Sequence, residues 1–455
     1  MATFSIENFG CRATDADAAA IRHELLNSGF TLAPSHDSAS IVVLNTCTVT
    51  AAADSQAREA VRKIHAANPE ARVIVTGCYA QRAPDELAAI PGVTWVVGNS
   101  HQARIPALAR EFAPGTTQER GTGASDFIPV NVLRGNISGL QAAKIISDDM
   151  FGDLPVQVGP AAFMAGDRTR PVLKVQDGCN HRCSYCVIPL VRGRSRSLPA
   201  DQAISQVRAL AARGVKEIVL SGINLGSYGR DLVPRVELTG LVQQILCETS
   251  IERLRFSSME PQDVTEDFVS LMASSARLAP HFHVPLQSGS DRILKAMHRW
   301  YRSAHYAERV HMIRRLMPNA AIGADVIVGF PGETDEDFRA TLDLIGDLPF
   351  TYLHVFSFSA RPGTAAVTLG NTVPANTIRE RARALRTLAR QKSAEFRSSQ
   401  SGSVLRALTL ARSGDHWTEA ITGNYLKVRV PGEHAANRWL DVRLGPEGNV
   451  EEVRT

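Results

Sequence analysis

The chain is predicted to be an α/β protein of three parts. Short apolar runs alternate with helical patterns over residues 1–113, which indicates a doubly wound parallel sheet. The alternation returns over residues 167–398, where six βα units indicate an open, partial (β/α)6 barrel rather than the full eight-unit barrel. Short strands of alternating polarity over residues 401–455 indicate a small antiparallel β-barrel. Residues 114–166, which are rich in glycine and proline, are interpreted as a linker.

In the first part, each expected strand is an apolar run that is followed by a helical pattern. The strands are expected at residues 3–7, 41–45, 72–76 and 94–97, and the helices at residues 15–28, 54–68, 82–90 and 101–112. Because the strands are expected to be parallel, their carboxyl ends should meet at one edge of the sheet.

The second part has six such units, and the third part has short strands only. The six strands are expected at residues 172–176, 217–220, 253–257, 281–286, 322–328 and 352–358, with helices that include residues 200–213, 239–249, 263–273, 304–316 and 335–348. The third part contains the alternating segments SVLRALTLA, TEAITG, YLKVRV and WLDVRL.

Composition narrows the class of protein. Apolar residues make up 44% of the chain and charged residues 21%, which is typical of a globular protein and not of extended disorder. The net charge of +4 is too small to indicate a nucleic-acid partner by itself. No secretory signal or membrane span is evident, so we expect a cytoplasmic protein. In that compartment, seven cysteines are expected to ligate metals or act in catalysis rather than form disulfides.

Three cysteines follow the first strand of the predicted barrel at C-x3-C-x2-C spacing. Cys179, Cys183 and Cys186 can bind one metal centre without long-range folding, and soft sulfur ligands favour zinc or an iron–sulfur cluster. His181 could complete a tetrahedral zinc site. The alternative is a [4Fe–4S] cluster with one open iron, which is favoured because barrels keep their active sites at the carboxyl ends of strands.

A second set of cysteines follows three strands of the first part. Cys11, Cys47 and Cys78 each lie just after a predicted strand, so all three should meet in the crevice at the edge of the sheet. We interpret them as a second three-thiolate centre; the alternative is three unrelated buried cysteines. Cys247 lies in a helical pattern without such partners and is predicted to be an inert core residue.

The cysteine motifs resemble a known family. CNHRCSYC is similar to the cluster loop of radical S-adenosylmethionine enzymes, and together with NFGC, NTCTVT and GCYAQ it resembles their methylthiotransferases. The resemblance extends through IVLSGINLGSYG, HVPLQSGSD, VIVGFPGET and FSARPGT. Within the family, the branch that acts on N6-threonylcarbamoyladenosine of tRNA is most similar. Its sister branches act on isopentenyladenosine of tRNA or on an aspartate of a ribosomal protein.

The resemblance implies a chemistry. Cys179, Cys183 and Cys186 would hold the [4Fe–4S] cluster that cleaves S-adenosylmethionine to methionine and a 5′-deoxyadenosyl radical. Cys11, Cys47 and Cys78 would hold an auxiliary [4Fe–4S] cluster that carries the transferred sulfur, and a second S-adenosylmethionine would give the methyl group. An electron donor of the flavodoxin or ferredoxin type and a sulfur source would be required. A non-radical iron–sulfur or zinc protein that binds RNA or transfers electrons is the alternative of a different class.

Cosubstrate contacts are implied less directly. Tyr185 would pack against the adenine of the bound nucleoside. Ser221 and Gly222 stand where related enzymes have a glycine-glycine-glutamate pattern, so backbone carbonyls could replace the glutamate there. Further candidates for ribose or carboxylate contacts are Ser257, Glu260 and Gln287; the alternative is that these three cap helices or turns. His281 and His283 share one face of a strand and are predicted to form hydrogen bonds in the barrel interior rather than to bind a metal.

The expected partner is the anticodon stem-loop of tRNA, modified at position 37. Three regions are candidate contacts: an extended segment with Arg192, Arg194 and Arg196, a stripe on the helix at residues 377–397 that includes Arg386 and Arg390, and outward-facing Tyr425, Lys427 and Arg429. The alternatives are a solvated loop and a soluble helix face with extended arginines. The last region resembles the RNA-binding TRAM module, but its basic and acidic residues balance at seven each.

Overall fold

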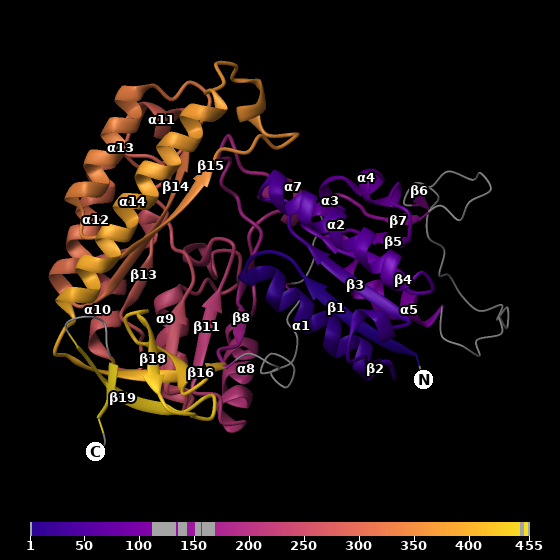
Figure 1. The fold of residues 1–455 in the computed structure, drawn as a ribbon, viewed down its shortest axis with the longest axis horizontal. Helices are drawn as coiled ribbons and strands as arrows, with labels where there is room; N and C mark the ends of the chain where they lie inside the picture. Colours follow the sequence, from indigo (N-terminus) through magenta and orange to yellow (C-terminus); the bar gives the residue numbers. More distant parts are fainter. Residues whose placement is uncertain are drawn as a thin grey trace.

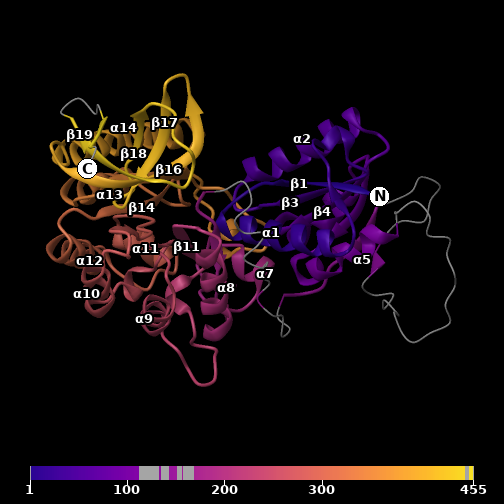
Figure 2. The ribbon, with the colours of Figure 1, turned by 90° about the horizontal axis from the view of Figure 1, so that it is seen from below.

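The computed structural model describes residues 2–111, 133–134, 143–150, 156, 169–445 and 450–453. The predicted α/β class is confirmed: a parallel sheet, a partial parallel barrel and a small antiparallel sheet follow one another along the chain (Figure 1). The N-terminal sheet lies beside the barrel, and the C-terminal sheet packs against one end of it (Figure 2).

The N-terminal sheet has the strand order β2-β1-β3-β4-β5-β7-β6, with all neighbours parallel except β6 and β7. Its strands are β1 (Thr3–Asn8), β2 (Thr31–Leu32), β3 (Ile41–Thr46), β4 (Arg72–Gly77), β5 (Val93–Val97), β6 (Leu133–Arg134) and β7 (Lys144–Ile146). β3 is buried along its whole length because helices cover both faces of the sheet. β6 and β7 lie in the segment expected to be a linker, most of which is outside the described residues.

Helices of this part cover the two faces of the sheet. They are α1 (Arg12–Asn27), α2 (Ala51–Ala67), α3 (Cys78–Arg82), α4 (Pro84–Ala88) and α5 (Ile105–Arg110), with the 3-10 turns η1 (His36–Ser38) and η2 (Asn99–Arg104). The side chains of α2 to α4 form one apolar core, and those of α1 and α5 form another on the opposite face. The doubly wound arrangement expected from the sequence is therefore present.

The barrel has the six strands expected from the sequence, in two parallel groups of three. These are β8 (Val172–Lys174), β11 (Glu217–Ser221), β12 (Arg253–Phe256), β13 (His281–His283), β14 (Ala321–Val328) and β15 (Tyr352–Ser357). A parallel bridge between Ser258 and His283 joins the two groups. The apolar core lies between these strands and the helices outside them.

The helices of the barrel cover its outer side. They are α8 (Ala200–Ala212), α9 (Leu238–Glu248), α10 (Glu266–Ser274), α11 (Asp291–Ala296), α12 (Ser303–Leu316), α13 (Asp335–Asp347) and α14 (Ala375–Ser399). The shorter elements are β9 (Gln176–Asp177), α7 (Ile188–Arg192), β10 (Arg196–Ser197), η3 (Leu225–Ser227), η4 (Pro261–Asp263) and η5 (Ala365–Thr368). α13 begins with a capping box in which Thr334 and Asp337 satisfy each other's backbone N–H groups.

The C-terminal sheet is antiparallel and nearly closed, with the order β18-β17-β16-β19-β20. Its strands are β16 (Val404–Gly414), β17 (Trp417–Thr422), β18 (Lys427–Pro431), β19 (Trp439–Leu444) and β20 (Val450–Glu452). Arg255 of β12 anchors this sheet, because its guanidinium donates to the carbonyls of Thr422 at 3.1 Å and Gly423 at 3.0 Å and pairs with buried Glu217.

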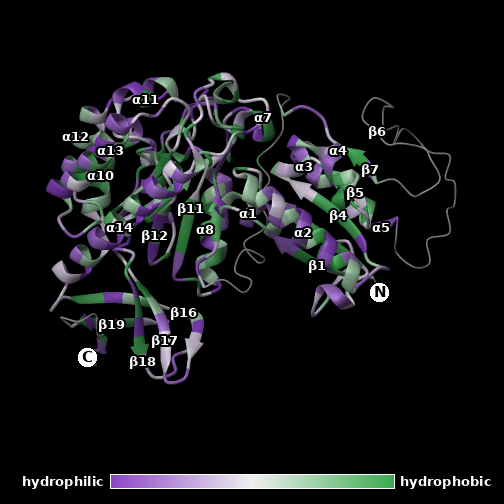
Figure 3. Cartoon of the chain, turned by 45° about the horizontal axis from the view of Figure 1, so that its top comes forward, coloured by the Kyte–Doolittle hydropathy of each residue, from purple (hydrophilic) through white to green (hydrophobic). Residues whose placement is uncertain are grey.

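Several strands of the barrel and of the N-terminal sheet are largely hydrophobic, whereas the outer helices carry hydrophilic and hydrophobic residues side by side (Figure 3). Within the described part of the chain, none of the helices combines the length and apolarity that crossing a membrane requires.

Candidate functional site

Three cysteines lie at the carboxyl ends of three adjacent strands of the N-terminal sheet. Cys11 caps α1 after β1, Cys47 follows β3 directly, and Cys78 is the first residue of α3 after β4. Because β1, β3 and β4 are neighbours, the strand order brings these turns to one edge of the sheet. We call Cys11, Cys47 and Cys78 the auxiliary triad.

Two glycines make this convergence possible. Gly77 has φ +96°, and a Cβ at this position would lie 2.3 Å from the carbonyl oxygen of Thr46. Gly10 has φ +136°, and a Cβ there would lie 2.7 Å from the Cβ of Cys47. Side chains at either position would therefore separate the turns that carry the thiols.

Three of the other four cysteines lie in the loop after β9, at the carboxyl end of the first barrel strand. Cys179 donates its backbone N–H to the carbonyl of Gly193 at 3.0 Å, and Ser184 donates its hydroxyl to the carbonyl of Ala296 at 2.8 Å. These bonds tie the loop to the end of α7 and to the end of α11. We call Cys179, Cys183 and Cys186 the barrel triad.

The two triads are separated by one short helix. Val187 and Val191, at either end of α7, pack directly against Cys78. Asn99 strengthens the contact, because its amide donates to the carbonyl of Val191 at 2.8 Å and approaches the Sγ of Cys78 at 3.6 Å. α7 and α3 lie side by side in Figure 1. Cys78 of the auxiliary triad therefore lies against the helix that directly follows Cys186 of the barrel triad.

The spacing of the thiols argues against zinc. In a tetrahedral site the sulfur ligands are about 3.8 Å apart, given zinc–sulfur bonds of about 2.3 Å. Among the described residues, which include all seven cysteines, no group of three or more metal-ligating side chains within 4.8 Å of one another contains a cysteine. His181, the candidate fourth zinc ligand, has its ring 5.9 Å from that of Trp300 and is not part of any such group. Three thiols that do not all lie within 4.8 Å of one another fit a [4Fe–4S] cluster, whose cysteine ligands bind different irons, better than a single zinc ion.

Burial controls the protonation of these thiols. It raises the pKa of Cys47 to about 12 and of Cys186 to about 12, and neighbouring thiols of the same triad add to both shifts. Burial likewise raises the pKa of Cys179 to about 11. Since iron binds thiolates, cluster assembly must displace protons from these sites.

An arginine stands beside each triad. Arg299 donates from Nη1 to the Sγ of Cys183 at 3.2 Å and pairs with Glu260. Arg192 is a neighbour of the auxiliary triad, where its charge favours the thiolate forms of Cys47 and Cys78. The Nε of Arg192 is buried and has no hydrogen-bond partner, which fits an acceptor such as the sulfur of a cluster.

The prediction that Arg192 contacts RNA is wrong. Arg192 ends α7, only 2% of its side chain is exposed, and it pairs with Asp17 at 2.7 Å and Asp177 at 3.0 Å. The expected extended segment does not include Arg192, because this residue is helical and Gly193, with φ +71°, turns the chain before the short strand β10 at Arg196–Ser197. Arg194 is exposed, while Arg196 is half-buried and donates to the carbonyl of Arg192.

A cavity of about 200 Å³ lies beside the barrel triad. It is lined by both halves of the chain, with Val49 and Thr50 on one side and Tyr185, Cys186, Val187, Ile188, Gln287, Asp325, Ile327 and the segment 356–359 on the other. The structure therefore brings two cosubstrate candidates, Tyr185 and Gln287, to one cavity. We call this cavity the reaction chamber.

The remaining cosubstrate candidates lie outside that cavity. Ser221 and Ser257 are buried at the ends of β11 and β12, and the Ser257 hydroxyl accepts the backbone N–H of Gly222 at 3.3 Å. Glu260 is engaged by Arg299, whose role the sequence did not indicate. The available signal was the carboxylate of Glu260, since an arginine that is buried beside the thiols, such as Arg299, needs a carboxylate partner.

The two histidines of β13 form hydrogen bonds inside the barrel, as predicted. His281 and His283 lie 2.8 and 3.0 Å from the hydroxyl of Tyr352. His283 also lies 3.0 Å from a carboxylate oxygen of Asp325, which His354 approaches at 3.1 Å. Sequence reasoning missed Asp325 and His354, because their contact depends on the register between the neighbouring strands β14 and β15.

Two further expectations are wrong. Tyr425 does not face outward: its φ of +66° takes it out of the strand alternation, and its ring packs 4.3 Å from that of His281. Cys247 is exposed on α9 rather than part of the core. Lys427 and Arg429 are exposed, as predicted.

The basic stripe of the long helix faces solvent. Arg386 and Arg390 are exposed on α14, while Ala382, Leu385 and Phe396 of the same helix are buried. The amphipathic pattern read from the sequence is therefore present.

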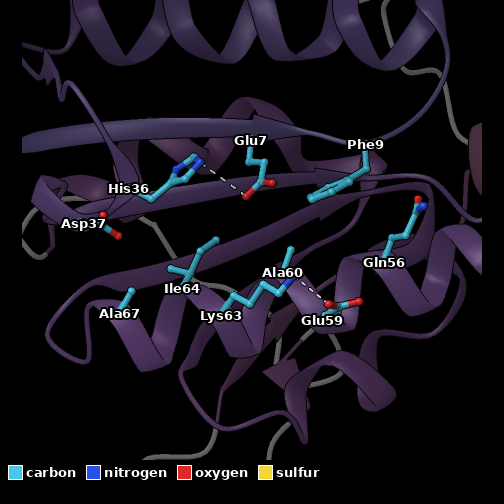
Figure 4. Close-up of a pocket in the computed structure, with 10 residues that line it drawn as sticks. All are labelled: Glu7, Phe9, His36, Asp37, Gln56, Glu59, Ala60, Lys63, Ile64 and Ala67. Carbon is cyan, nitrogen blue, oxygen red and sulfur yellow. Dashed lines mark ion pairs between the residues drawn. The ribbon is translucent and has the colours of Figure 1, made fainter.

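A second cavity lies away from the thiols, beside α2 and η1 (Figure 4). It has a volume of about 520 Å³ and carries a Glu7–His36 ion pair and a Lys63–Glu59 ion pair. No cysteine lines it, so it is separate from the triads.

Comparisons with known proteins agree with this arrangement. The model of the "Radical SAM superfamily" matches residues 173–345, and that of "Uncharacterized protein family UPF0004" matches residues 3–98. The Threonylcarbamoyladenosine tRNA methylthiotransferase MtaB of Aquifex aeolicus is 35% identical, over 97% of this chain and 99% of the relative. The Bacillus subtilis protein of the same name is 34% identical, over 95% and 91%.

Other relatives carry other names. A tRNA-2-methylthio-N(6)-dimethylallyladenosine synthase of Geobacter metallireducens is 30% identical, over 96% of this chain and 95% of the relative. Among solved structures, the radical S-adenosylmethionine methyltransferase TsrM of Kitasatospora setae has a TM-score of 0.56 at 17% identity, over 80% of this chain and 77% of that one. This last likeness concerns the fold alone.

Proposed function

The chain belongs to the radical S-adenosylmethionine methylthiotransferase family that acts on tRNA, and from this premise we propose that it methylthiolates C2 of N6-threonylcarbamoyladenosine at position 37, beside the anticodon. The observation that carries this proposal is the pair of three-cysteine sites that are connected through α7, which follows Cys186 and packs against Cys78. A reaction that joins sulfur to a carbon needs both sites within reach of one substrate.

Cofactors supply the difficult chemistry. The adenine C2–H bond is neither acidic nor electrophilic enough for acid–base catalysis, so the reaction needs one-electron chemistry. When bound, two [4Fe–4S] clusters and S-adenosylmethionine supply that chemistry, together with a sulfur and a methyl group. The barrel triad would hold one cluster and the auxiliary triad the other. An electron donor of the flavodoxin or ferredoxin type and a sulfur source complete the reaction.

The chain's own residues position these groups. Arg299 holds Cys183 by hydrogen bonding to its sulfur, and Glu260 holds Arg299 in turn. Tyr185 and Gln287 line the reaction chamber and would contact the nucleoside of S-adenosylmethionine. Backbone groups near Ser221, Gly222 and Ser257 would contact its methionine part. Apolar Val187 and Ile327 help to exclude water from the chamber.

Exposed cations provide the surface for tRNA. Arg194 lies on the loop next to the barrel triad, Arg386 and Arg390 lie on α14, and Lys427 and Arg429 lie on β18. Phosphate contacts of this kind orient a nucleic acid and make its binding dependent on salt. We place this activity in the cytoplasm, where the tRNA is.

Anaerobic reconstitution tests the reaction class. The holoenzyme with dithionite and S-adenosylmethionine should release 5′-deoxyadenosine, and with a threonylcarbamoyl-modified anticodon stem-loop it should form the methylthio nucleoside. Absence of 5′-deoxyadenosine would contradict radical chemistry and favour an RNA-binding or electron-transfer protein.

The substrate is tested separately. Nucleoside mass spectrometry of a deletion strain without a redundant enzyme should show loss of the methylthio-threonylcarbamoyl nucleoside. Loss of the methylthio-isopentenyl nucleoside, or of the modified ribosomal-protein aspartate, would instead assign the chain to a sister activity.

A further inference from the structure

A polar group lies on the inner face of the barrel, on strands that face the reaction chamber. Nε2 of His283 and Nδ1 of His354 lie 3.0 and 3.1 Å from the same carboxylate oxygen of Asp325. Asp325 and His354 are direct partners in the register of β14 and β15. These side chains project from one face because alternate residues of a strand do so.

Part of this polar group is exposed to solvent, whereas the interior of a small barrel is normally filled by side chains. His354 keeps 55% of its side chain exposed, and Phe356, two residues further along β15, keeps 41%. Asp325 and Phe356 both line the reaction chamber, together with Tyr185 and Cys186 of the barrel triad. Asp325 thus joins the mostly apolar lining of the chamber to His354, which lies outside that lining and is open to solvent; we call these two side chains the polar wall.

A cation lies at the other end of a row of aromatic rings that begins at His354. Arg12, the first residue of α1, is half-buried, and its Nη2 lies 3.5 Å from the hydroxyl of Tyr425. The Tyr425 ring packs 5.5 Å from that of Tyr352, whose ring is 5.3 Å from that of His354. No carboxylate of the described residues forms an ion pair with Arg12. A half-buried guanidinium without an anion is a ready partner for one.

We propose that Asp325, His354 and Arg12 bind the substituent on N6 of the target adenosine and select a polar, anionic one. This inference rests on the proposed function and deepens it. The hydroxyl and N–H groups of a threonylcarbamoyl substituent match Asp325 and His354, and its carboxylate matches Arg12. The adenine ring would lie against the apolar lining of the chamber that includes Phe356.

The polar wall rejects an apolar substituent. An isopentenyl group would cover Asp325 and His354 without replacing their hydrogen bonds to water, and unpaired buried polar groups are costly. Sites built to hydrogen-bond a substrate discriminate strongly against analogues that lack the polar atoms. The polar wall therefore points to the threonylcarbamoyl substrate.

A divalent metal ion is the other occupant that this chemistry allows. The ligand atoms of His283, Asp325 and His354 all lie within 4.8 Å of one another. Metal analysis of the holoenzyme separates the two occupants, since a metal here would add to the iron of the clusters and would depend on His354.

The test uses anaerobically reconstituted holoenzyme and three anticodon stem-loop RNAs that differ only beside the anticodon. One carries N6-threonylcarbamoyladenosine, one N6-isopentenyladenosine and one unmodified adenosine. Equilibrium binding is measured for the wild type, His354→Phe and Arg12→Gln. His311→Phe is the matched control, because His311 is exposed on α12, outside the barrel. Iron content and circular dichroism report whether each variant is intact.

We expect His354→Phe and Arg12→Gln each to weaken binding of the threonylcarbamoyl RNA by about tenfold. Binding of the unmodified RNA should stay within about twofold, and His311→Phe should change neither. Equal effects of His354→Phe on all three RNAs, no effect, or loss of a bound non-cluster metal from this variant would overturn the inference alone. A wild-type enzyme that methylthiolates only the isopentenyl RNA would overturn the proposed substrate as well.

Discussion

Arg192 and Cys247 show that burial decides what a residue can do. Arg192 stands in an arginine-rich segment that looks suited to phosphate, yet its charge is enclosed by two aspartates. Cys247 stands in an apolar helical pattern, yet it is exposed. Neither outcome follows from local sequence, because both depend on which face of a helix meets another part of the chain.

The division of six thiols into two triads leads to a prediction about single residues. Cys47→Ala should remove the auxiliary cluster, reduce bound iron by about half and leave S-adenosylmethionine cleavage intact, because the two triads lie on separate loops. Colorimetric iron analysis and assay of 5′-deoxyadenosine measure the two effects.

Cys247→Ala is the matched control, since Cys247 is a cysteine outside both triads. It should leave the iron content unchanged. Loss of all iron from Cys47→Ala would show that the six thiols form a single centre, against the separation proposed above.

At the scale of elements, the turns after β1, β3 and β4 hold the auxiliary triad in place. Gly77→Ala would combine an unfavourable φ of +96° with a Cβ 2.3 Å from the backbone oxygen of Thr46. We expect it to lower the free energy of unfolding by about 2–3 kcal/mol and to deplete auxiliary iron, because α3 begins at Cys78.

Gly214→Ala isolates the part of this effect that comes from the positive φ alone. Gly214 also has a positive φ, +81°, but a Cβ there would meet nothing within 4 Å. Its cost should be about 1–2 kcal/mol with full iron content. Urea unfolding and iron analysis of both variants compare the two; equal costs and equal iron would show that the crowding at Gly77 is not important.

Helices and strands were predicted correctly where apolar residues recur regularly. The direction of a side chain was missed where a single backbone angle determines it. The six barrel strands and the amphipathic α14 follow from regular patterns of apolar residues. Tyr425 fails because its φ of +66° reverses the direction that alternation assigns to it. The convergence of Cys11, Cys47 and Cys78 was predictable, because parallel strands fix where their ends lie. Asp325 and His354 were not, because their contact depends on register between strands.

At the scale of the whole molecule, a buried group of four charges joins the N-terminal part to the barrel. Asp17 of α1 pairs with Lys174 of β8 at 2.5 Å and with Arg192 at 2.7 Å, and both cations also pair with Asp177. Burial would raise the pKa of Asp177, but Lys174 and Arg192 lower it well below its usual range. The four buried side chains thus comprise two carboxylates and two cations, and the half-buried Arg196 lies at their edge, 3.9 Å from Asp177.

This group of charges sets the orientation of the two triads, because α1 begins next to Cys11 and Arg192 ends the helix that follows Cys186. Asp17→Asn leaves two buried cations with one carboxylate, and Arg192→Gln leaves two carboxylates with one cation. Each single change should lower the free energy of unfolding by about 3–5 kcal/mol. The double variant restores equal numbers of carboxylates and cations in the group, so its cost should fall below the sum of the two by at least about 1 kcal/mol.

Anaerobic urea unfolding of the holoenzyme measures these three costs, and the exposed pair Arg208–Glu248 is the control, with side chains 58% and 48% exposed. Removing either partner of that pair should cost less than about 1 kcal/mol. Strictly additive costs for Asp17→Asn and Arg192→Gln would mean that the two charges do not act together. The link between the thiol sites would then have to come from the apolar contact of α7 with Cys78 alone.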